Sequence, residues 1–331
     1  MDLPLLSALF LLFALMMYVM LDGFDLGVGA LLFAQRDERV RNRMVDAIAP
    51  TWDGNETWLV MAALTLLAGF PRAYGILLPA FYIPILLMLL SLGLRGVSFE
   101  FRHNSETLRR RWDLVFAGGS LVAALAQGLV VGGLIQGVDT DLDSFGGSPL
   151  DIFRPFCLLA GVTVVAGYAT LGVGWLRLKG EDATRAFALR HQRWLPIALL
   201  ALTIITGAIA ATMQPHLAVS WRDHRTALAV CLLAFIGCAL GIVWSAGRDD
   251  ADDRIGFGLA LAMVLSGVVA LDLSFFPYVI PFRLTLWEAA SARSTQKFLL
   301  IGALVVTPVV LTYTAFAYRV FRGRTPDAGW Y

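Results

Sequence analysis

The chain has 331 residues, of which 58% are hydrophobic and only 15% charged, and its mean hydropathy is +0.71. Soluble domains carry about 45–50% apolar and about 25% charged residues, so this composition excludes an ordinary soluble protein and indicates a polytopic membrane protein. With a net charge of +1 and no basic stripe, the sequence gives no reason to expect a nucleic-acid partner.

Apolar runs predict an all-α architecture of transmembrane helices. A helix needs about 20 residues to cross a hydrocarbon core of about 30 Å. Nine runs meet this requirement, at approximately 5–33, 50–70, 74–94, 113–136, 155–176, 195–213, 226–246, 255–276 and 298–320.

The orientation of these helices is predicted from the basic residues between them. If the loops after the first, third, fifth and seventh runs lie on one side with the C-terminal tail, that side holds 19 of the 26 lysines and arginines, and the other side holds 7. Because cytoplasmic loops carry the excess of basic residues, we expect the N-terminus outside and the C-terminus inside.

The first apolar run contains two acids, in the segment MLDGFDLGVG at 20–29. Asp22 and Asp25 are three positions apart, so they share a helix face near the cytoplasmic end of this span. Two carboxylates in a poorly solvated place cannot both ionise cheaply, which allows such a pair to carry a proton near neutral pH. Alternatively, both acids reach toward water or pair with an arginine of the loop at 36–43.

The second run opens with the segment APTWDGNETWLV at 49–60. The residues after its last acid, 57–70, would form about 21 Å of helix, which is too short to cross the membrane. We therefore expect the helix to begin near Ile48 or Pro50. This start draws the acids of the segment to the membrane edge or into the membrane.

The polar residues of this segment allow two interpretations. Asp53 and Glu56 have the spacing of a capping box at a helix start, with Trp52 and Trp58 as interfacial anchors. A carboxylate at the cytoplasmic mouth, with Asn55 beside it, can also collect protons. The two interpretations are compatible.

Arg95 and Glu100 lie at the cytoplasmic end of the third run. Their charges could tune the protonation of nearby acids. The alternative is an arginine that extends to the interface from a helix end, followed by a loop acid.

Two acidic stretches are expected to be solvated turns. The first, DTDLDS at 139–144, begins like a calcium loop, but position 6 is Ser144 where glycine is needed and position 12 is Leu150 where glutamate is needed. The second is DDADD at 249–253.

The four histidines, by contrast, indicate what the chain does not bind. Each lies in an expected loop or at the end of an apolar run: His103, His191, His216 and His224. No pair is placed to ligate a haem iron between two helices, so any haem should reside in another chain. No HExxH, CxxC or P-loop motif indicates a site of soluble-enzyme type.

Six segments, in chain order, resemble subunit II of the cytochrome bd-type quinol oxidases. They are LDGFDLGVG (21–29), APTWDGNETWLV (49–60), LRGVSFEFR (94–102), LIQG (134–137), FPYVIP (276–281) and LTLWEA (284–289). The match extends over nearly the whole chain, and the first two motifs are the specific ones. The compact length and the run Phe-Glu-Phe-Arg at 99–102 resemble the cyanide-insensitive branch of that family.

This resemblance implies two four-helix bundles plus a ninth helix. The expected units are a first bundle at 1–137, an outer acidic loop at 138–152, a second bundle at 153–276, and an outer loop, ninth helix and cytoplasmic tail at 277–331.

The resemblance also implies partners and cofactors. In the family, the chain forms a heterodimer with subunit I in the bacterial cytoplasmic (inner) membrane, in contact with lipid and quinone. Subunit I carries haem b and haem d, or b-type haem alone, and the site for the substrate quinol, while subunit II alone binds no cofactor. A small single-span accessory subunit is a further partner that the resemblance allows.

The function implied is that of a subunit of an electrogenic quinol:oxygen oxidoreductase without independent activity, which contributes a cytoplasmic proton pathway. The matching positions are Asp25 and Asp53, flanked by Asp22 and Asn55, whereas Glu56 replaces a glutamine found in other members. Two other functions remain open from the residues alone. A proton-coupled transporter would also place acids in its spans, although usually near the midplane, and a purely structural assembly subunit would need none.

Overall fold

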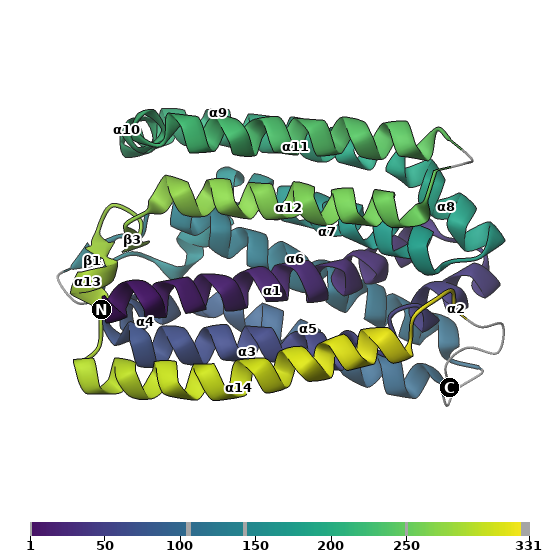
Figure 1. The fold of residues 1–331 in the computed structure, drawn as a ribbon, viewed down its shortest axis with the longest axis horizontal. Coiled ribbons are helices and arrows are strands. Elements are labelled where there is room, and N and C mark those ends of the chain that lie inside the picture. The colour runs from purple at the N-terminus through teal and green to yellow at the C-terminus, as the bar shows by residue number, and fades with distance from the viewer. Residues whose placement is uncertain (1, 104–106, 142–143, 249–250, 326–331) are drawn as a thin grey trace.

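The computed structural model describes residues 2–103, 107–141, 144–248 and 251–325. Long helices lie side by side along the longest axis of the molecule (Figure 1). These helices are α1 (Leu3–Leu31), α3 (Trp52–Gly69), α5 (Tyr82–His103), α6 (Arg109–Gln136), α7 (Pro155–Lys179), α9 (Leu195–Met213), α11 (Arg225–Ala246), α12 (Asp253–Phe275) and α14 (Arg293–Val320).

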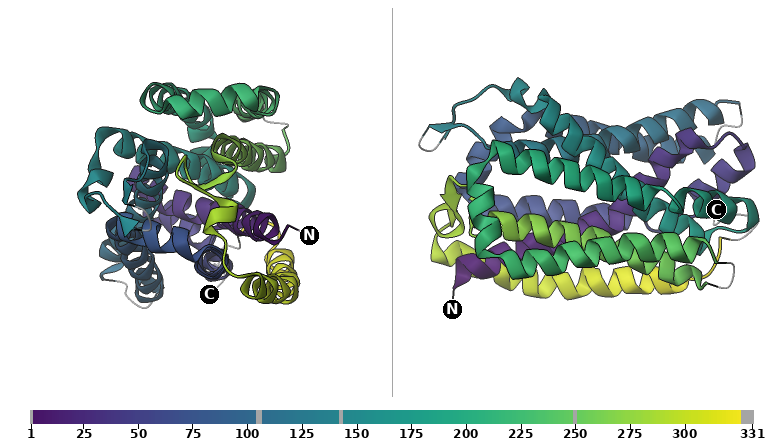
Figure 2. Two further views of the ribbon diagram at one scale, coloured as in Figure 1. Left: turned by 90° about the vertical axis from the view of Figure 1, so that its left-hand side faces the viewer. Right: turned by 90° about the horizontal axis from the view of Figure 1, so that it is seen from above.

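Short elements connect the long helices at both ends of the molecule (Figures 1 and 2). The short helices are η1 (Leu32–Ala34), α2 (Glu38–Asp46), α4 (Pro71–Ala80), η2 (Pro149–Phe153), α8 (Asp182–Gln192), α10 (Pro215–Asp223) and α13 (Leu286–Ala289). Two antiparallel strand pairs join β1 (Thr140–Asp141) to β2 (Ser144–Phe145) and β3 (Tyr278–Ile280) to β4 (Leu284–Thr285). Of the two stretches expected to be solvated turns, residues 142–143 and 249–250 lie outside the described ranges.

By length and composition, eight helices of the described ranges could each cross a membrane. The expected span that is not among them is the one formed by α3, which has 18 residues. Its first turns carry Asp53, Asn55 and Glu56, which lower its mean hydropathy. The polytopic all-α class is confirmed, and the number nine stays a prediction.

The third expected span, at 74–94, is divided in the structure. The helix breaks at Phe81, so that α4 ends before it and α5 begins after it and continues to His103. Pro84 has no N–H to donate to the carbonyl of Ala80, which removes one of the hydrogen bonds that a continuous helix would need. The segment able to cross the membrane is therefore displaced toward the C-terminus.

Glycines allow α1 and α7 to touch along their backbones. A Cβ atom at Gly27 would lie 1.8 Å from the carbonyl oxygen of Tyr168, and one at Gly172 would lie 2.7 Å from the backbone of Gly27. Small residues permit such close packing in membranes, where van der Waals contact replaces the hydrophobic effect. As a result, α7 lies at the centre of the molecule and packs against α1, α6, α9 and α12.

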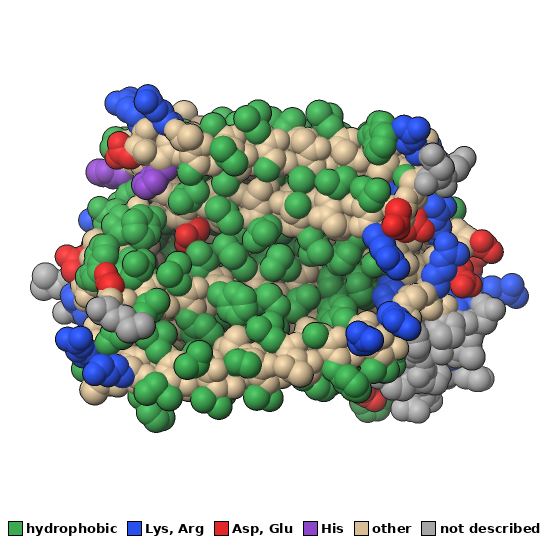
Figure 3. Space-filling model, viewed as in Figure 1, with side chains coloured by type: hydrophobic (Ala, Val, Ile, Leu, Met, Phe, Trp, Pro, Cys, Tyr) green, Lys and Arg blue, Asp and Glu red, His purple; other side chains and the backbone are tan. Residues whose placement is uncertain are grey.

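In contrast, α14 lies on the outside, against α1 and α3 (Figure 1). Its most apolar window has 0% of its residues buried, compared with 61% for α7. Apolar side chains cover the middle of the face seen in Figure 3, and charged side chains gather at its two ends. This distribution is the one expected for helices that cross a bilayer.

Candidate functional site

The last third of α1 buries both of its acids. Asp22 and Asp25 have 0% exposure, in a segment where glycines bring neighbouring helices close. Intramembrane acids that face the interior of a helical bundle are functional by default. The burial of both acids of the segment at 20–29 is therefore what a functional site in this helix would require.

A single arginine of α5 joins the first motif to the second. Nη2 of Arg95 donates to Oδ1 of Asp22 at 2.7 Å and to Oε1 of Glu56 at 2.5 Å. The side chains of Arg95 and Asp22 are 1% and 0% exposed, and that of Glu56 is 27% exposed. The guanidinium carbon also lies 5.7 Å from the ring centroid of Trp52, in a cation–π contact. Arg95 is thus the central cation of the site.

Asp25 has an amide as its partner. Nδ2 of Asn55 donates to Oδ2 of Asp25 at 2.7 Å and to the carbonyl of Leu21 at 3.3 Å. Oδ1 of Asn55 accepts a hydrogen bond from the hydroxyl of Tyr318, on α14, at 3.2 Å. Sequence reasoning did not identify Tyr318, because it is separated from Asn55 by 263 positions and no local motif marks it.

The acid cluster, defined as Asp22, Asp25, Asn55, Glu56 and Arg95, has more acids than bases. Asp22 and Glu56 both pair with the single guanidinium group of Arg95, and Asp25 accepts from a neutral amide, so three carboxyl groups share one positive charge. Among the described residues, Oδ2 of Asp22 and Oδ1 of Asp25 have no hydrogen-bond partner, and neither do Nε and Nη1 of Arg95. Because buried unpaired charge is costly, binding a proton lowers the electrostatic energy of this arrangement.

The capping interpretation of the second motif is wrong. The N-cap of α3 is Thr51, without a side-chain cap, and Glu56 turns to Arg95 instead of the helix start. The helix begins at Trp52 rather than near Ile48 or Pro50, because turns with backbone hydrogen bonds carry the chain over 47–51.

Asp53 and Glu100 are exposed and are not among the buried members of the site. Asp53 lies in the first turn of α3, one turn before Glu56. Glu100 lies five residues beyond Arg95, on a different face of α5.

Neither acid of α1 forms one of the described ion pairs with an arginine of 36–43. Asp22 pairs with Arg95, and Arg41 instead donates to Oδ2 of Asp113 at 2.9 Å. Asp113 also accepts from Nε of Arg102 at 2.6 Å. Sequence reasoning missed Asp113, although an acid at the start of the apolar run at 113–136 was a signal of a buried partner.

A buried polar chain lies beyond Asp22. The hydroxyl of Tyr168 donates to Oε1 of Gln127 at 2.6 Å, and Nε2 of Gln127 donates to the hydroxyl of Tyr18 at 2.8 Å. Tyr18 is one turn before Asp22 on the same face of α1. Because an amide does not readily give up a proton, this chain is better suited to joining α1, α6 and α7 than to conducting protons.

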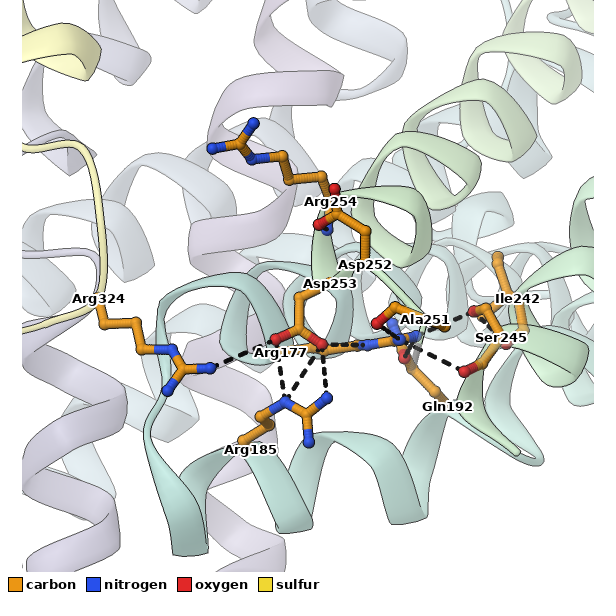
Figure 4. A network of polar contacts seen from close by, with 10 residues as sticks. All are labelled: Arg177, Arg185, Gln192, Ile242, Ser245, Ala251, Asp252, Asp253, Arg254 and Arg324. Carbon is orange, nitrogen blue, oxygen red and sulfur yellow. Dashed lines mark hydrogen bonds and ion pairs between the residues drawn. The ribbon is translucent and has the colours of Figure 1, made fainter. Parts of the chain in front are cut away.

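A second cluster of charges surrounds Asp253, which was expected to be a solvated turn residue. That expectation is wrong: Nε of Arg177 and Nη2 of Arg185 each lie 2.9 Å from Oδ1 of Asp253. Arg324 approaches Oδ2 at 3.8 Å, and Figure 4 shows all three arginines pointing toward this carboxylate. Here bases outnumber the acid, so the cluster has none of the spare carboxyl groups found around Arg95.

The described residues contain no group of three or more histidine, cysteine, aspartate or glutamate side chains that could hold a metal ion. The fold and the acid cluster together define a multi-pass helical membrane protein with a buried site that can bind protons.

Comparison with known proteins identifies the family. The family model for cytochrome bd terminal oxidase subunit II matches residues 3–321, and the chain belongs to this family. The resemblance found in the sequence motifs is therefore confirmed, and the chain is a subunit of a terminal oxidase.

Two relatives named cytochrome bd ubiquinol oxidase subunit 2 illustrate the similarity. The bd-I protein of Escherichia coli strain K12 is 31% identical over 93% of this chain and 91% of its own length. The protein of Bacillus subtilis strain 168 is 30% identical over 93% and 92%. A chain of the bd oxidase from Geobacillus thermodenitrificans has the same fold, with a TM-score of 0.75, 16% identity, and coverage of 97% of this chain and 99% of that chain.

Proposed function

We propose that this chain is the haem-free subunit II of an electrogenic quinol:oxygen oxidoreductase and that it supplies cytoplasmic protons for the reduction of oxygen to water. Family membership supports the role in a terminal oxidase, and two relatives are named ubiquinol oxidase subunits. Protons taken from the cytoplasm move against the membrane potential at about 2.3 kcal/mol per elementary charge per 100 mV, which conserves energy.

The main support for the proton pathway is the excess of carboxyl groups over basic groups in the acid cluster. Two carboxyl groups on the guanidinium of Arg95 and a third, Asp25, on a neutral amide form a site with excess negative charge, and two of the three carboxyl groups are fully buried. A purely structural site would be expected to balance its buried charges. The Asp253 cluster, with no spare acid, illustrates such a structural arrangement.

Each member of the site has a proposed role. Asp53, exposed at the start of α3, collects protons, and Glu56 one turn later lies between it and the interior. Asp22 is the ion-pair partner of Arg95, whereas Asp25 accepts its hydrogen bond from the neutral amide of Asn55, so Asp25 is the group that we assign to binding and releasing the proton. Glu100, exposed near the end of α5, contributes negative charge at the surface.

The membrane arrangement belongs to the same proposal. We assign α3 as a ninth span, which groups α1, α3, α5 and α6 as the first bundle (1–137) and α7, α9, α11 and α12 as the second (153–276). The loop at 138–152 lies outside. The segment 277–331 comprises an outer loop, the last of the nine spans, α14, and the cytoplasmic tail. The N-terminus is outside, which places the acid cluster near the cytoplasmic face.

The partner in this proposal is subunit I, which binds haem b with haem d or with further b-type haem and offers the quinol site. A small single-span subunit and lipid complete the complex in the bacterial cytoplasmic membrane. This chain supplies acid and amide side chains, and the redox chemistry takes place in the partner.

The test replaces single acids in the assembled complex. Asp25→Asn and Asp53→Asn should each slow quinol-driven oxygen consumption while the complex retains its haems. Asparagine keeps the shape of aspartate but does not titrate, so turnover should be preserved if the acid at that position is purely structural and lost if it carries protons. Glu56→Gln is the matched control and should have the milder effect, because the family tolerates glutamine at this position.

Wild-type turnover in all three variants, measured per haem, would show that the acids are structural. The proton path would then lie wholly in the partner subunit. Loss of the haems from the purified variants would show instead that the acids serve assembly.

A further inference from the structure

The outermost long helix places one polar side chain into the acid cluster. Tyr318 lies near the end of α14, and its hydroxyl donates to Oδ1 of Asn55 at 3.2 Å. Most of α14 faces outward, and Tyr313, five residues earlier, is 63% exposed. Tyr318 is thus the residue by which α14 reaches the acid cluster, while Gln296 near the other end of the helix accepts from the hydroxyl of Ser7.

This contact, together with the carbonyl of Leu21, stabilises the orientation in which the nitrogen of the Asn55 amide faces Asp25. An asparagine side chain has one oxygen that accepts and one nitrogen that donates two hydrogen bonds. With the hydroxyl of Tyr318 on its oxygen, Asn55 directs its nitrogen to Oδ2 of Asp25 and to the carbonyl of Leu21. A reversed amide would present its oxygen to Asp25, and an ionised carboxylate has no proton to donate to that oxygen.

The aromatic ring of Tyr318 has a separate packing role. It packs at 73° against Trp175, with ring centroids 5.9 Å apart. It also lines a cavity of about 10 Å³ together with Thr51, Lys179 and Phe321. Phenylalanine can preserve both of these contacts, so Tyr318→Phe removes the hydroxyl alone.

We propose that Tyr318 is a positioning residue for Asp25, acting through Asn55, so that α14 takes part in proton uptake as well as in packing. The inference rests on the proposed function, because it assigns Tyr318 a role at the same acid cluster. In the wild type, the amide is held in the orientation that donates to ionised Asp25. Without the hydroxyl, only the carbonyl of Leu21 and Asp25 itself hold the amide, so it samples the reversed orientation more often, in which it retains a proton on Asp25 and delays its release.

The test compares Tyr318→Phe with Tyr313→Phe in the assembled, haem-containing complex. Tyr313 is on the same helix, and among the described residues its hydroxyl has no hydrogen-bond partner. We expect Tyr318→Phe to lower kcat for quinol-driven oxygen consumption about fivefold, the change that loss of one buried hydrogen bond implies, with an unchanged KM for quinol. Tyr313→Phe should match the wild type in both constants.

A third arm tests the route through Asp25. In the Asp25→Asn background, Tyr318→Phe should cause no further loss, because the group that it positions no longer titrates. Equal kcat for Tyr318→Phe and Tyr313→Phe would overturn the inference, and so would a further fivefold loss in the Asp25→Asn background.

These outcomes separate this inference from the proposed function. If Asp25→Asn slows turnover but Tyr318→Phe does not, the positioning role fails and the proton pathway stands. If Asp25→Asn turns over at the wild-type rate, the proton pathway itself fails.

Discussion

Arg95 offers the sharpest test of the charge arrangement, through the substitution Arg95→Met. The variant keeps an unbranched side chain but leaves Asp22 buried without its ion-pair partner. Removing one member of a buried ion pair costs about 3–5 kcal/mol. Glu56, whose side chain is 27% exposed, loses less because water can replace the guanidinium, and we assign it under about 1 kcal/mol. Most of the expected destabilisation therefore comes from Asp22.

The assay is thermal unfolding of the purified complex in detergent, for the single variant and for Arg95→Met combined with Asp22→Asn. The double variant should recover most of the lost stability, because replacing a buried ion pair by neutral groups is often close to neutral. Arg109→Met removes a partly exposed arginine whose ion pair with Glu38 is 3.8 Å long, and it should change stability by under about 0.5 kcal/mol. A double variant as unstable as the single one would refute the assignment of the cost to Asp22.

Two further predictions concern packing and orientation. Gly27→Ala should separate α1 from α7 and lower the amount of assembled complex, because the added Cβ would lie 1.8 Å from the carbonyl oxygen of Tyr168. Gly93→Ala is the control, because a Cβ there meets nothing within 4 Å. Equal haem recovery from the two variants would contradict the close contact. In a cysteine-free background, an impermeant thiol reagent applied to intact cells should label a cysteine at Ser144 but not one at Glu38, and the reverse pattern would invert the assigned orientation.

Hydropathy and isolated charges predicted the parts of this protein that depend on local sequence. Each long helix coincides with an expected apolar run, apart from the displacement of the third one. Asp22 and Asp25 were identified because acids inside an apolar run are costly to place without a role. The length of the second run predicted that its acids lie at the membrane edge or inside the membrane.

The remaining features depend on contacts between distant segments. Tyr318 and Asn55 meet only because α14 packs on α1 and α3, and no local pattern predicts that packing. Asp253 belongs to an acidic stretch that looks solvated, and its partner Arg177 is 76 positions away. The break at Phe81 was missed because the apolar run continues across it. Its cause is the missing N–H of Pro84, which a hydropathy scale does not register.

The place of α14 in the chain has a consequence for biosynthesis. Asp25, Asn55 and Arg95 are synthesised within the first third of the chain, whereas Tyr318 leaves the ribosome after every other long helix has been made. The hydrogen bond to Asn55 can therefore form only after α14 has inserted beside α1 and α3. An early intermediate in membrane insertion holds the acids without the hydroxyl that orients their amide neighbour, and the site is completed only when the last helix docks.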